Sequence, residues 1–383
     1  MVAETAALSV LGPRAQHLAL LSVLFAAVLW LRNPSILLDA QFWAEDGWIW
    51  YPDAYSAGLA SLFSPVTGYL QTLSRLVALL SQPFPLSWAP TLFAATAFAV
   101  QLAPAIFLVS DRMEAAWPSL RGRALFALLY LALPNSYETF VNLTNAQWYL
   151  AILAFLVVTG KSPTGWVGTV FDAGVLLLSG FSGPFCLALL PIVLLRLREG
   201  SSQAARWRAG LVLIPALVQG GFLLTSIGSR SLGPLGADPI LLARIIATQI
   251  VGAGLIGSNA MAYLSTEPFW ESAALPVAVT LLAAGAAAVA LLRGPRLLKY
   301  AFLFAWLIFG AALLSPIVDA TKPQWPLMAT AVGAGNRYYQ FPMLTMVAAL
   351  LSLAADSRLS LRIFGSALLA LMLVGIVGDW DEV

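Results

Sequence analysis

Three carboxylates stand close together in the first part of the chain. Asp39, Glu45 and Asp46 fall within eight positions, although the whole chain of 383 residues has only 18 acidic side chains. They follow a long apolar run, and ionisable groups beside such a run cost free energy unless a polar cavity, a partner or a task stabilises them. One carboxylate of a neighbouring pair can hold a partner while the other exchanges a proton. The cluster therefore predicts general-base chemistry, with Asp46, Glu45 or Asp39 as the base.

Aromatic side chains lie among these acids. The same segment contains Trp43, Trp48, Trp50, Tyr51 and Tyr55. Rings that flank carboxylates on both sides are typical of sugar-binding sites, where a ring stacks on a pyranose face and a carboxylate accepts hydroxyl protons. Trp43 is the expected substrate-binding ring. The alternative is an aromatic belt at a membrane surface, with the acids solvated at the level of the head groups.

A second polar group precedes another apolar run. Glu138, Asn142 and Asn145 are four and three positions apart, so on a helix they would share one face, and Gln147 and Trp148 follow them. A polar face at the entry to an apolar run suggests an aqueous cavity, and we expect all five residues to bind substrate. The alternative is helix capping combined with an aromatic belt.

A third group, Arg337, Tyr338 and Tyr339, opens a late apolar run. A planar guanidinium suits a phosphate or a carboxylate, and neighbouring phenols can add hydrogen bonds. The group predicts a site in which Arg337 and Tyr338 hold a phosphate and Tyr339 contacts the substrate. The alternative is a structural ion pair between Arg337 and an acid elsewhere. The candidate partners are Glu267, Glu271, Asp319 and the Asp39/Asp46 cluster.

Arg75 is unusual because it lies inside the second apolar run. Gln71 and Thr72 are a turn or less away, which predicts a polar stripe facing the interior of a helix bundle. A charged residue within such a run is a functional candidate by default. We therefore assign Arg75 to the predicted phosphate site as well.

Composition identifies the class of protein that must position these groups. Of all residues, 60% are hydrophobic and 10% are charged, which is typical of an all-α polytopic membrane protein. At roughly 20 residues per span, the chain has room for about 11–13 transmembrane helices and no large soluble domain. Residues 1–383 are therefore expected to form a single transmembrane domain. The net charge of +2 provides no basic patch, so nucleic-acid binding is not expected.

The scarcity of histidine and cysteine excludes several chemistries. His17 and Cys186 are the only residues of their types, so zinc catalysis, a Ser-His-Asp triad and an intramolecular disulfide are excluded. We expect no metal site and no required cofactor, although a Glu-Asp pair could bind Mg²⁺ or Mn²⁺ together with a phosphate. The apolar run that starts at His17 lacks a following cleavage site and is expected to be a retained helix rather than a signal peptide.

Loop charges predict an orientation in the membrane. Basic residues concentrate in the loops 196–208, 293–299 and 358–362, which are therefore expected to be cytoplasmic. The outer side would then hold the first extracytoplasmic loop 33–66, the loops 134–147, 227–271 and 316–337, and the C-terminal residues.

One basic loop, 110–123, does not fit this count. Two apolar runs, 68–82 and 87–109, separate it from 33–66, so the two loops would lie on the same side. Either one of these runs does not cross, or 110–123 is an exception to the charge bias.

Two segments are expected to depart from simple spans. The run 239–256 carries Arg244 and Gln249, which favours an interfacial or re-entrant helix, and a thirteenth crossing is the alternative. The segment 179–184, with two glycines and a proline, divides a long apolar stretch. It is either a tight turn between two short helices or a break that lines a cavity.

The layout of these features resembles the GT-C superfamily of integral membrane glycosyltransferases. The shared features are an N-terminal helix, an acidic and aromatic first outer loop, many helices with short loops, and a late Arg-Tyr-Tyr motif at 337–339. The resemblance implies a GT-C-like fold and transfer of a sugar from a polyprenyl-phosphate donor to a hydroxyl of a glycan, lipid or protein acceptor, with inversion. It implies Asp46 or Glu45 as the base, Asp39 as an alternative or helper, and Arg337 as the phosphate ligand. The expected location is the inner membrane of a bacterium, with the active site facing the periplasm or exterior.

Two other classes of function fit parts of the pattern. A lipid or sugar transporter or flippase would also have broken helices and a polar central cavity. A non-enzymatic membrane subunit would require only the aromatic-belt interpretation. Charge-neutral changes in the first outer loop would leave such a subunit unaffected.

Overall fold

The computed structural model describes residues 12–200, 202–226 and 233–380. Residues 1–11, the start of the predicted outer loop 227–271 and the acidic residues at 381–383 lie outside it. The described residues form helices, with a single antiparallel bridge between Val66 and Tyr69. Among these residues, seven helices are long and apolar enough to cross a membrane, fewer than the 11–13 expected, and they confirm the class of all-α multi-pass membrane protein. They are α2 (Pro13–Arg32), α6 (Ala89–Val109) with the turn before it, α11 (Gln203–Ser226), the segment Pro239–Ile256, α16 (Ala274–Arg293), α17 (Arg296–Leu314) and α20 (Leu359–Gly378).

Shorter helices complete the bundle. They are α7 (Leu120–Leu131), α8 (Ala146–Thr159), α9 (Trp166–Phe181), α10 (Phe185–Glu199) and α19 (Gln340–Ala354). α8 lies at the centre, and every one of its 14 residues is buried. At 1.5 Å per residue it is about 21 Å long, well below the roughly 30 Å of a hydrocarbon core. The polar segment ahead of α8 therefore enters the body of the protein.

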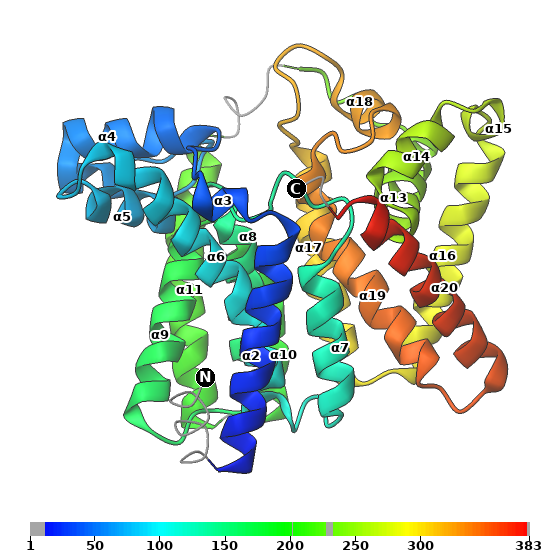
Figure 1. Ribbon diagram of the computed structural model, residues 1–383, viewed down its shortest axis with the longest axis horizontal. Helices are drawn as coiled ribbons and strands as arrows, with labels where there is room; N and C mark the ends of the chain where they lie inside the picture. The colour runs from blue at the N-terminus through cyan, green and yellow to red at the C-terminus, as the bar shows by residue number, and fades with distance from the viewer. Residues whose placement is uncertain (1–11, 201, 227–232, 381–383) are drawn as a thin grey trace.

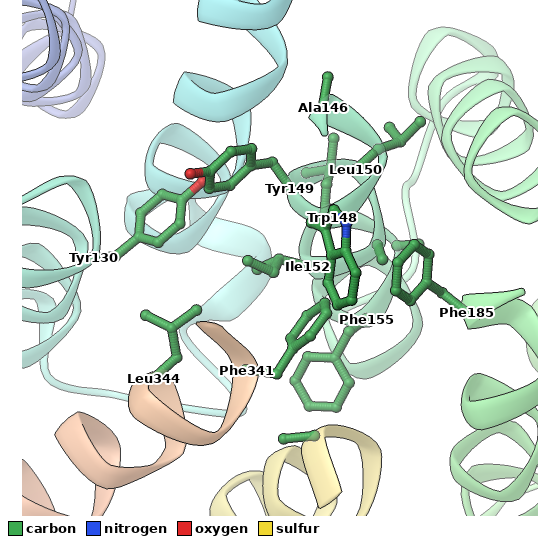
Figure 2. Packing of buried hydrophobic residues seen from close by; sticks show 14 of the residues in the cluster. Tyr130, Ala146, Trp148, Tyr149, Leu150, Ile152, Phe155, Phe185, Phe341 and Leu344 are labelled. Carbon is green, nitrogen blue, oxygen red and sulfur yellow. The ribbon is translucent and has the colours of Figure 1, made fainter. Parts of the chain in front are cut away.

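Aromatic rings hold α8 against its neighbours. The Trp148 ring lies 4.8 Å from that of Phe185 on α10 and 5.6 Å from that of Phe341 on α19, measured between centroids. Farther along, Phe155 stacks on Phe304 of α17 at 5.3 Å. Figure 2 shows the rings of Phe185 and Phe341 beside those of Trp148 and Phe155 on α8. Close aromatic packing of this kind fixes the start of α8, where the polar residues lie.

Short helices cover one end of the bundle, which we call the outer end (Figure 1). They include α3 (Ser35–Leu38), the π-helical turn η1 (Asp46–Trp50), α4 (Tyr51–Ala57), the 3₁₀ segment η2 (Gly58–Phe63) and α5 (Thr72–Ser81). α5 has 10 residues and spans about 15 Å, too short to cross a membrane. The apolar run 68–82 is therefore not a span, and α6 alone separates 33–66 from 110–123. This removes the conflict in the loop count.

The segment Pro239–Ile256 is also long enough for a span, and half of its residues are buried inside the protein. It consists of α12 (Pro239–Ile245), the π-helical η5 (Ile246–Gly252) and α13 (Ala253–Ile256). The chain just before it pairs with α18 (Gln324–Thr330), since the Trp325 amide donates to the Leu235 carbonyl at 3.0 Å. The chain just after it meets Asp379 at the end of α20. α18 and the end of α20 lie at the same end of the bundle (Figure 1), which favours the predicted re-entrant arrangement. The remaining short elements, α14 (Ser258–Ser265), α15 (Pro268–Glu271) and η6 (Asn336–Tyr338), lie beyond it in the chain.

An ion cluster fastens the opposite end. Asp172 on α9 is fully buried and accepts from Arg112 Nη1 at 2.6 Å and from Arg208 Nη2 at 2.7 Å. The two guanidinium groups also donate to the carbonyls of Lys161 and Gly160. The loop 110–123, α9 and α11 are thereby joined at the end that carries the basic loops.

Candidate functional site

A cavity of about 620 Å³ lies below the outer loops. Its upper wall comes from loop segments and its lower wall from α10, α11 and α17. The polar side chains that line it are Glu45, Thr67, Tyr69, Gln71, Glu138, Thr144, Asn145, Gln147, Ser315, Arg337 and Tyr338. The apolar lining on the three helices consists of Phe185, Leu187, Ala188, Pro191, Leu223, Leu307, Ile308, Ala311 and Ala312. This cavity therefore has one polar end and one apolar end, and we name it the donor cavity after the role that we propose for it.

The break at 179–184 contributes to this cavity. α9 ends at Phe181 and α10 begins at Phe185, so the predicted interruption is confirmed. Pro184 and Phe185 both line the donor cavity. Of the two interpretations of this break, the structure favours the one in which it lines a cavity.

Arg337 is paired at the polar end of the donor cavity. Its Nη1 contacts Glu138 Oε1, and its backbone amide donates to Glu138 Oε2 at 2.9 Å. Its Nη2 donates to the Tyr338 hydroxyl at 3.0 Å. The alternative of an ion pair between Arg337 and an acid elsewhere is therefore present, but its partner is Glu138 rather than Glu267, Glu271, Asp319 or a first-loop acid. The partner lies 199 residues away in sequence, and no local pattern indicates it.

Asp46 is buried beside the donor cavity. Its exposed fraction is 2%, and it begins the π-helical turn η1, a geometry that is frequent at functional sites. Its Oδ1 accepts from the Thr144 hydroxyl at 2.8 Å, and that hydroxyl in turn accepts from Trp50 Nε1 at 2.9 Å. Its Oδ2 accepts a long contact, 3.4 Å, from the Trp43 amide, and the Thr144 backbone also hydrogen-bonds this carboxyl. Within the described residues no cation pairs with this carboxylate.

The surroundings of Asp46 change its acidity. Burial raises the pKa of its carboxyl to about 7, although the hydrogen bonds from Thr144 and Trp43 act in the opposite direction and Glu45 adds a smaller upward effect. A carboxyl whose pKa lies near neutral pH can take up a proton and release it again under ordinary conditions. Asp46 is therefore the first-loop acid best suited to general-base chemistry.

A second, smaller cavity of about 220 Å³ is lined by Asp46 and shares Trp43 with the donor cavity. We call it the small cavity. Asp39 and Gln41 are exposed at its rim, and the buried Asp46 and Asn142 lie deeper. The predicted site residues thus divide between two cavities. Those on the donor cavity are Trp43, Glu45, Glu138, Asn145, Gln147, Trp148, Arg337 and Tyr338, and those on the small cavity are Asp39, Trp43, Asp46 and Asn142.

Two predicted site residues line neither cavity. Arg75 is buried, its Nη1 donates to Asp53 at 3.0 Å, and its guanidinium lies 5.1 Å from the Trp50 ring. Tyr339 is fully buried, and its hydroxyl donates to the Ala334 carbonyl at 2.7 Å. Their positions favour support of the outer layer and of the motif at 337–339 rather than contact with a ligand.

The polar segment before α8 is not the helix considered above. Residues 134–145 form turns, and α8 begins only at Ala146. Asparagine side chains compete with helix formation by bonding nearby backbone groups. Accordingly, the Nδ2 atoms of Asn142 and Asn145 both donate to the Glu138 carbonyl at 2.8 Å. The three residues do come together, but through these turns. Thr144, which the sequence analysis did not select, lies in the same polar segment, and its hydroxyl donates to Asp46.

Backbone strain concentrates around the two cavities. Ala44, Thr67 and Val141 have positive φ angles of 40°, 52° and 40°. Left-handed backbone is unfavourable for residues with a Cβ and most of all for branched ones, and such strain persists mainly at functional sites. Ala44 and Thr67 line the donor cavity and Val141 the small cavity. Each of the two cavities therefore has at least one strained residue in its lining.

The residues at the donor cavity provide only some of the ligands that a cation would need. Among the described residues, no three His, Cys, Asp or Glu side chains come together as a metal site. Glu45 lines the donor cavity, while Glu138 already contacts Arg337. A Mg²⁺ or Mn²⁺ ion there would therefore need oxygen ligands from a bound phosphate in addition to Glu45.

Comparison of the chain with protein-family models, curated proteins and solved structures finds no match. The function is therefore argued from the geometry of the site.

Proposed function

We propose that this protein is a membrane glycosyltransferase that moves a sugar from a polyprenyl-phosphate donor to an acceptor hydroxyl, with inversion. The observation that supports this most directly is the shape of the donor cavity. Its polar end holds Arg337 and two carboxylates, and its apolar end lies on α10, α11 and α17. A prenyl chain needs apolar walls, while its phosphate and sugar need charged and hydrogen-bonding groups.

The donor is placed with its phosphate at Arg337. A quarter of the Arg337 side chain is exposed. Arg337 lines the cavity even though its guanidinium contacts Glu138. A bound phosphate would share this guanidinium with Glu138 and receive charge-assisted hydrogen bonds. Tyr338 adds a hydroxyl at the same place, and the amide of Gln147 and the carboxylate of Glu45 are suited to the sugar hydroxyls.

The chemical step assigns the base to Asp46. The acceptor hydroxyl attacks the anomeric carbon and transfers its proton to the Asp46 carboxylate, while the bond from that carbon to the phosphate oxygen breaks. The phosphate departs as an anion, so Arg337 stabilises charge that increases in the transition state. Attack opposite the leaving group inverts the anomeric centre. General-base assistance of this kind contributes about 10²–10⁴-fold in rate.

The same proposal places the site on the extracytoplasmic side, expected to be the periplasmic face of a bacterial inner membrane. Both cavities lie among the loops of the outer end. The basic loops at 196–208, 293–299 and 358–362 connect helices at the other end (Figure 1). We count the crossings without α5 and treat Pro239–Ile256 as re-entrant. The two ends of the chain then lie on opposite sides of the membrane, and the three basic loops all lie on the cytoplasmic side.

The direct test is transfer of radiolabelled sugar from a panel of polyprenyl-phosphate sugars by purified protein in lipid nanodiscs. Consumption of one donor supports the proposal. If no donor is consumed, while a labelled lipid or sugar crosses proteoliposomes that contain the protein, a transporter replaces the enzyme. Labelling of single cysteines engineered in 33–66 checks the orientation, and reaction only from the cytoplasmic side would contradict it.

A matched pair of variants tests the apolar end. Ala311 and Leu314 are both exposed on α17, but only Ala311 lines the donor cavity. Ala311→Trp should raise the KM for a long-chain donor, because the indole occupies space assigned to the prenyl chain. Leu314→Trp should leave that KM unchanged. Equal effects of the two substitutions would show that the prenyl chain does not lie between these helices.

A further inference from the structure

The wall between the two cavities is built from neighbouring residues that face opposite ways. Glu45 lines the donor cavity, and Asp46 lines the small cavity. Leu143 lines the small cavity, and the next residue, Thr144, lines the donor cavity. Trp43 contributes to both cavities. The Asp46–Thr144 hydrogen bond thus joins a residue that lines the small cavity to a residue that lines the donor cavity.

The small cavity is lined by neutral polar groups, aromatic rings and acids. Ser35 and Gln41 supply hydrogen-bonding groups at the rim, while Phe42 and Tyr137 supply ring surfaces. Among the described residues, Asp39 and Asp46 are the only charged ones that line it, and no basic side chain of this part of the chain does so. A phosphate or other anion would meet two carboxylates and no cation, which disfavours it.

Size gives a second constraint. The volume of about 220 Å³ lies below the roughly 300–1,000 Å³ of sites that hold drug-sized ligands. One sugar ring is of suitable size, and a long lipid chain is not. Since Asp39, Gln41 and Ser35 are exposed, a larger molecule attached to that ring can extend outward from the rim.

We infer that the small cavity is the acceptor site, and that it takes one neutral, hydroxylated sugar ring whose nucleophilic hydroxyl points at Asp46. This inference depends on the proposed glycosyl transfer. A sugar in the small cavity and a donor in the donor cavity then meet at the boundary beside Asp46 and Thr144. The acceptor hydroxyl contacts the anomeric carbon there, and the phosphate leaves on the far side of that carbon, toward Arg337.

The geometry also favours one oxygen for taking the proton. Asp46 Oδ1 accepts from the Thr144 hydroxyl at 2.8 Å, whereas the contact from the Trp43 amide to Oδ2 is long, at 3.4 Å. The acceptor hydroxyl therefore gives its proton to Oδ2 as its oxygen bonds to the anomeric carbon, and the donor phosphate leaves with the bonding electron pair. Asp46 afterwards releases the proton to water past the exposed Asp39 and Gln41.

Three measurements on wild type and two variants test the inference. Ser35→Trp places an indole at the rim of the small cavity, and Ser56→Trp is the matched control. Ser56 is exposed on α4 and lines neither cavity. The measurements are binding of methyl pyranosides by saturation-transfer NMR, transfer of donor sugar to the pyranoside that binds, and hydrolysis of the donor by water.

We expect binding by wild type and by Ser56→Trp, and at least a tenfold weaker signal for Ser35→Trp. Transfer should fall by the same factor in Ser35→Trp, while donor hydrolysis stays at the wild-type rate because the donor cavity is untouched. A phosphorylated pyranoside should bind less well than its methyl counterpart.

Other outcomes overturn the inference and locate the error. If no neutral pyranoside binds wild type, or if the two Trp variants bind equally, the small cavity is not the acceptor site. If Ser35→Trp lowers hydrolysis as much as transfer, the cavity serves the donor instead. If pyranosides bind as expected but wild type neither transfers nor hydrolyses any donor, the sugar site stands and the proposed transfer reaction fails.

Discussion

Two buried aspartates, one at each end of the bundle, differ in a way that separates structure from chemistry. Asp172 is fully buried and lies between the guanidinium groups of Arg112 and Arg208. Asp46 is almost as deeply buried, yet a threonine hydroxyl and backbone groups are its polar contacts within the described chain. A buried carboxylate with two cations is stabilised in its charged form, whereas one without a cation gains a proton easily.

The comparison shows why burial alone does not identify a catalytic acid. At the basic end, the ion cluster joins three segments and lines neither cavity. At the outer end, the single carboxylate lies between two cavities beside strained backbone. We expect neutralising substitutions at these two positions to have opposite consequences.

The largest effect is expected from Asp46→Asn. Transfer should fall about 10²–10⁴-fold, because the general base is lost while the amide keeps the shape of the site. Stability should not fall. The pKa of Asp46 in the folded state lies above its unfolded value, so stability of wild type decreases as pH rises from about 4 to about 7, and the amide removes this dependence. Transfer assays and thermal unfolding at pH 5 and pH 8 measure both consequences.

Glu45→Gln is the control for that experiment. Glu45 is adjacent in sequence but lines the donor cavity instead of the small one. Its loss should mainly alter sugar binding and raise the donor KM. A larger loss of kcat in Glu45→Gln than in Asp46→Asn would reverse the assignment of the base.

Asp172→Asn should reduce stability instead of chemistry. Removing one partner from a buried ion cluster costs about 3–5 kcal/mol, because Arg112 and Arg208 are left without compensation. The fraction that remains folded should retain wild-type kcat, since the cluster is far from the site. Unfolding in denaturant and active-site-normalised turnover provide the two readouts. Asp356→Asn, at a more exposed pair with Arg293 on the same basic end, should cost much less and is the control. A fall in kcat for Asp172→Asn would contradict the separation between the two ends.

Much of this contrast could be predicted from composition and pattern. The apolar content indicated the membrane class, and the density of acids, amides and aromatic rings indicated the outer loops that build the cavities. Glu138, Asn145, Gln147 and Arg337 all line the donor cavity, as their residue types suggested. The residues of a polar site can be predicted from sequence when polar side chains are rare in a mostly apolar chain.

The rest depends on geometry that local patterns do not carry. The Arg337–Glu138 contact joins residues far apart in sequence, and the assignment of Asp46 and Glu45 to different cavities follows from a left-handed Ala44 and a π-helical turn. α5 has the composition of a span but ends after 10 residues. The sequence suggested that Arg75 binds a ligand. Its partner is instead Asp53, and the two residues come together only when the outer layer folds.

A smaller effect is expected from Arg337→Lys. Lysine keeps the charge but cannot contact Glu138 and a phosphate through several nitrogens at once. We expect the donor kcat/KM to fall about tenfold, which corresponds to about 1.4 kcal/mol. Steady-state kinetics with varied donor concentration measure this. Lys322→Arg, on an exposed part of the same outer loop, is the control and should leave kcat/KM unchanged. An unchanged value in Arg337→Lys would mean that the phosphate binds elsewhere.

The smallest and most specific effect is expected from Thr144→Val. The Thr144 hydroxyl donates to Asp46 and lowers the pKa of that carboxyl, so its removal should raise the pKa further above about 7. The base is active when ionised. In wild type, kcat/KM should therefore increase with pH up to about 7 and then level off, and in Thr144→Val the plateau should begin at a higher pH. Thr144→Ser keeps the hydroxyl and should restore the wild-type profile. A general loss of packing would lower the rate at every pH alike, whereas a change in the acidity of Asp46 moves the profile along the pH axis and leaves the plateau height nearly unchanged. The position of the profile therefore tests directly whether the unpaired aspartate at the outer end is the group that takes the proton.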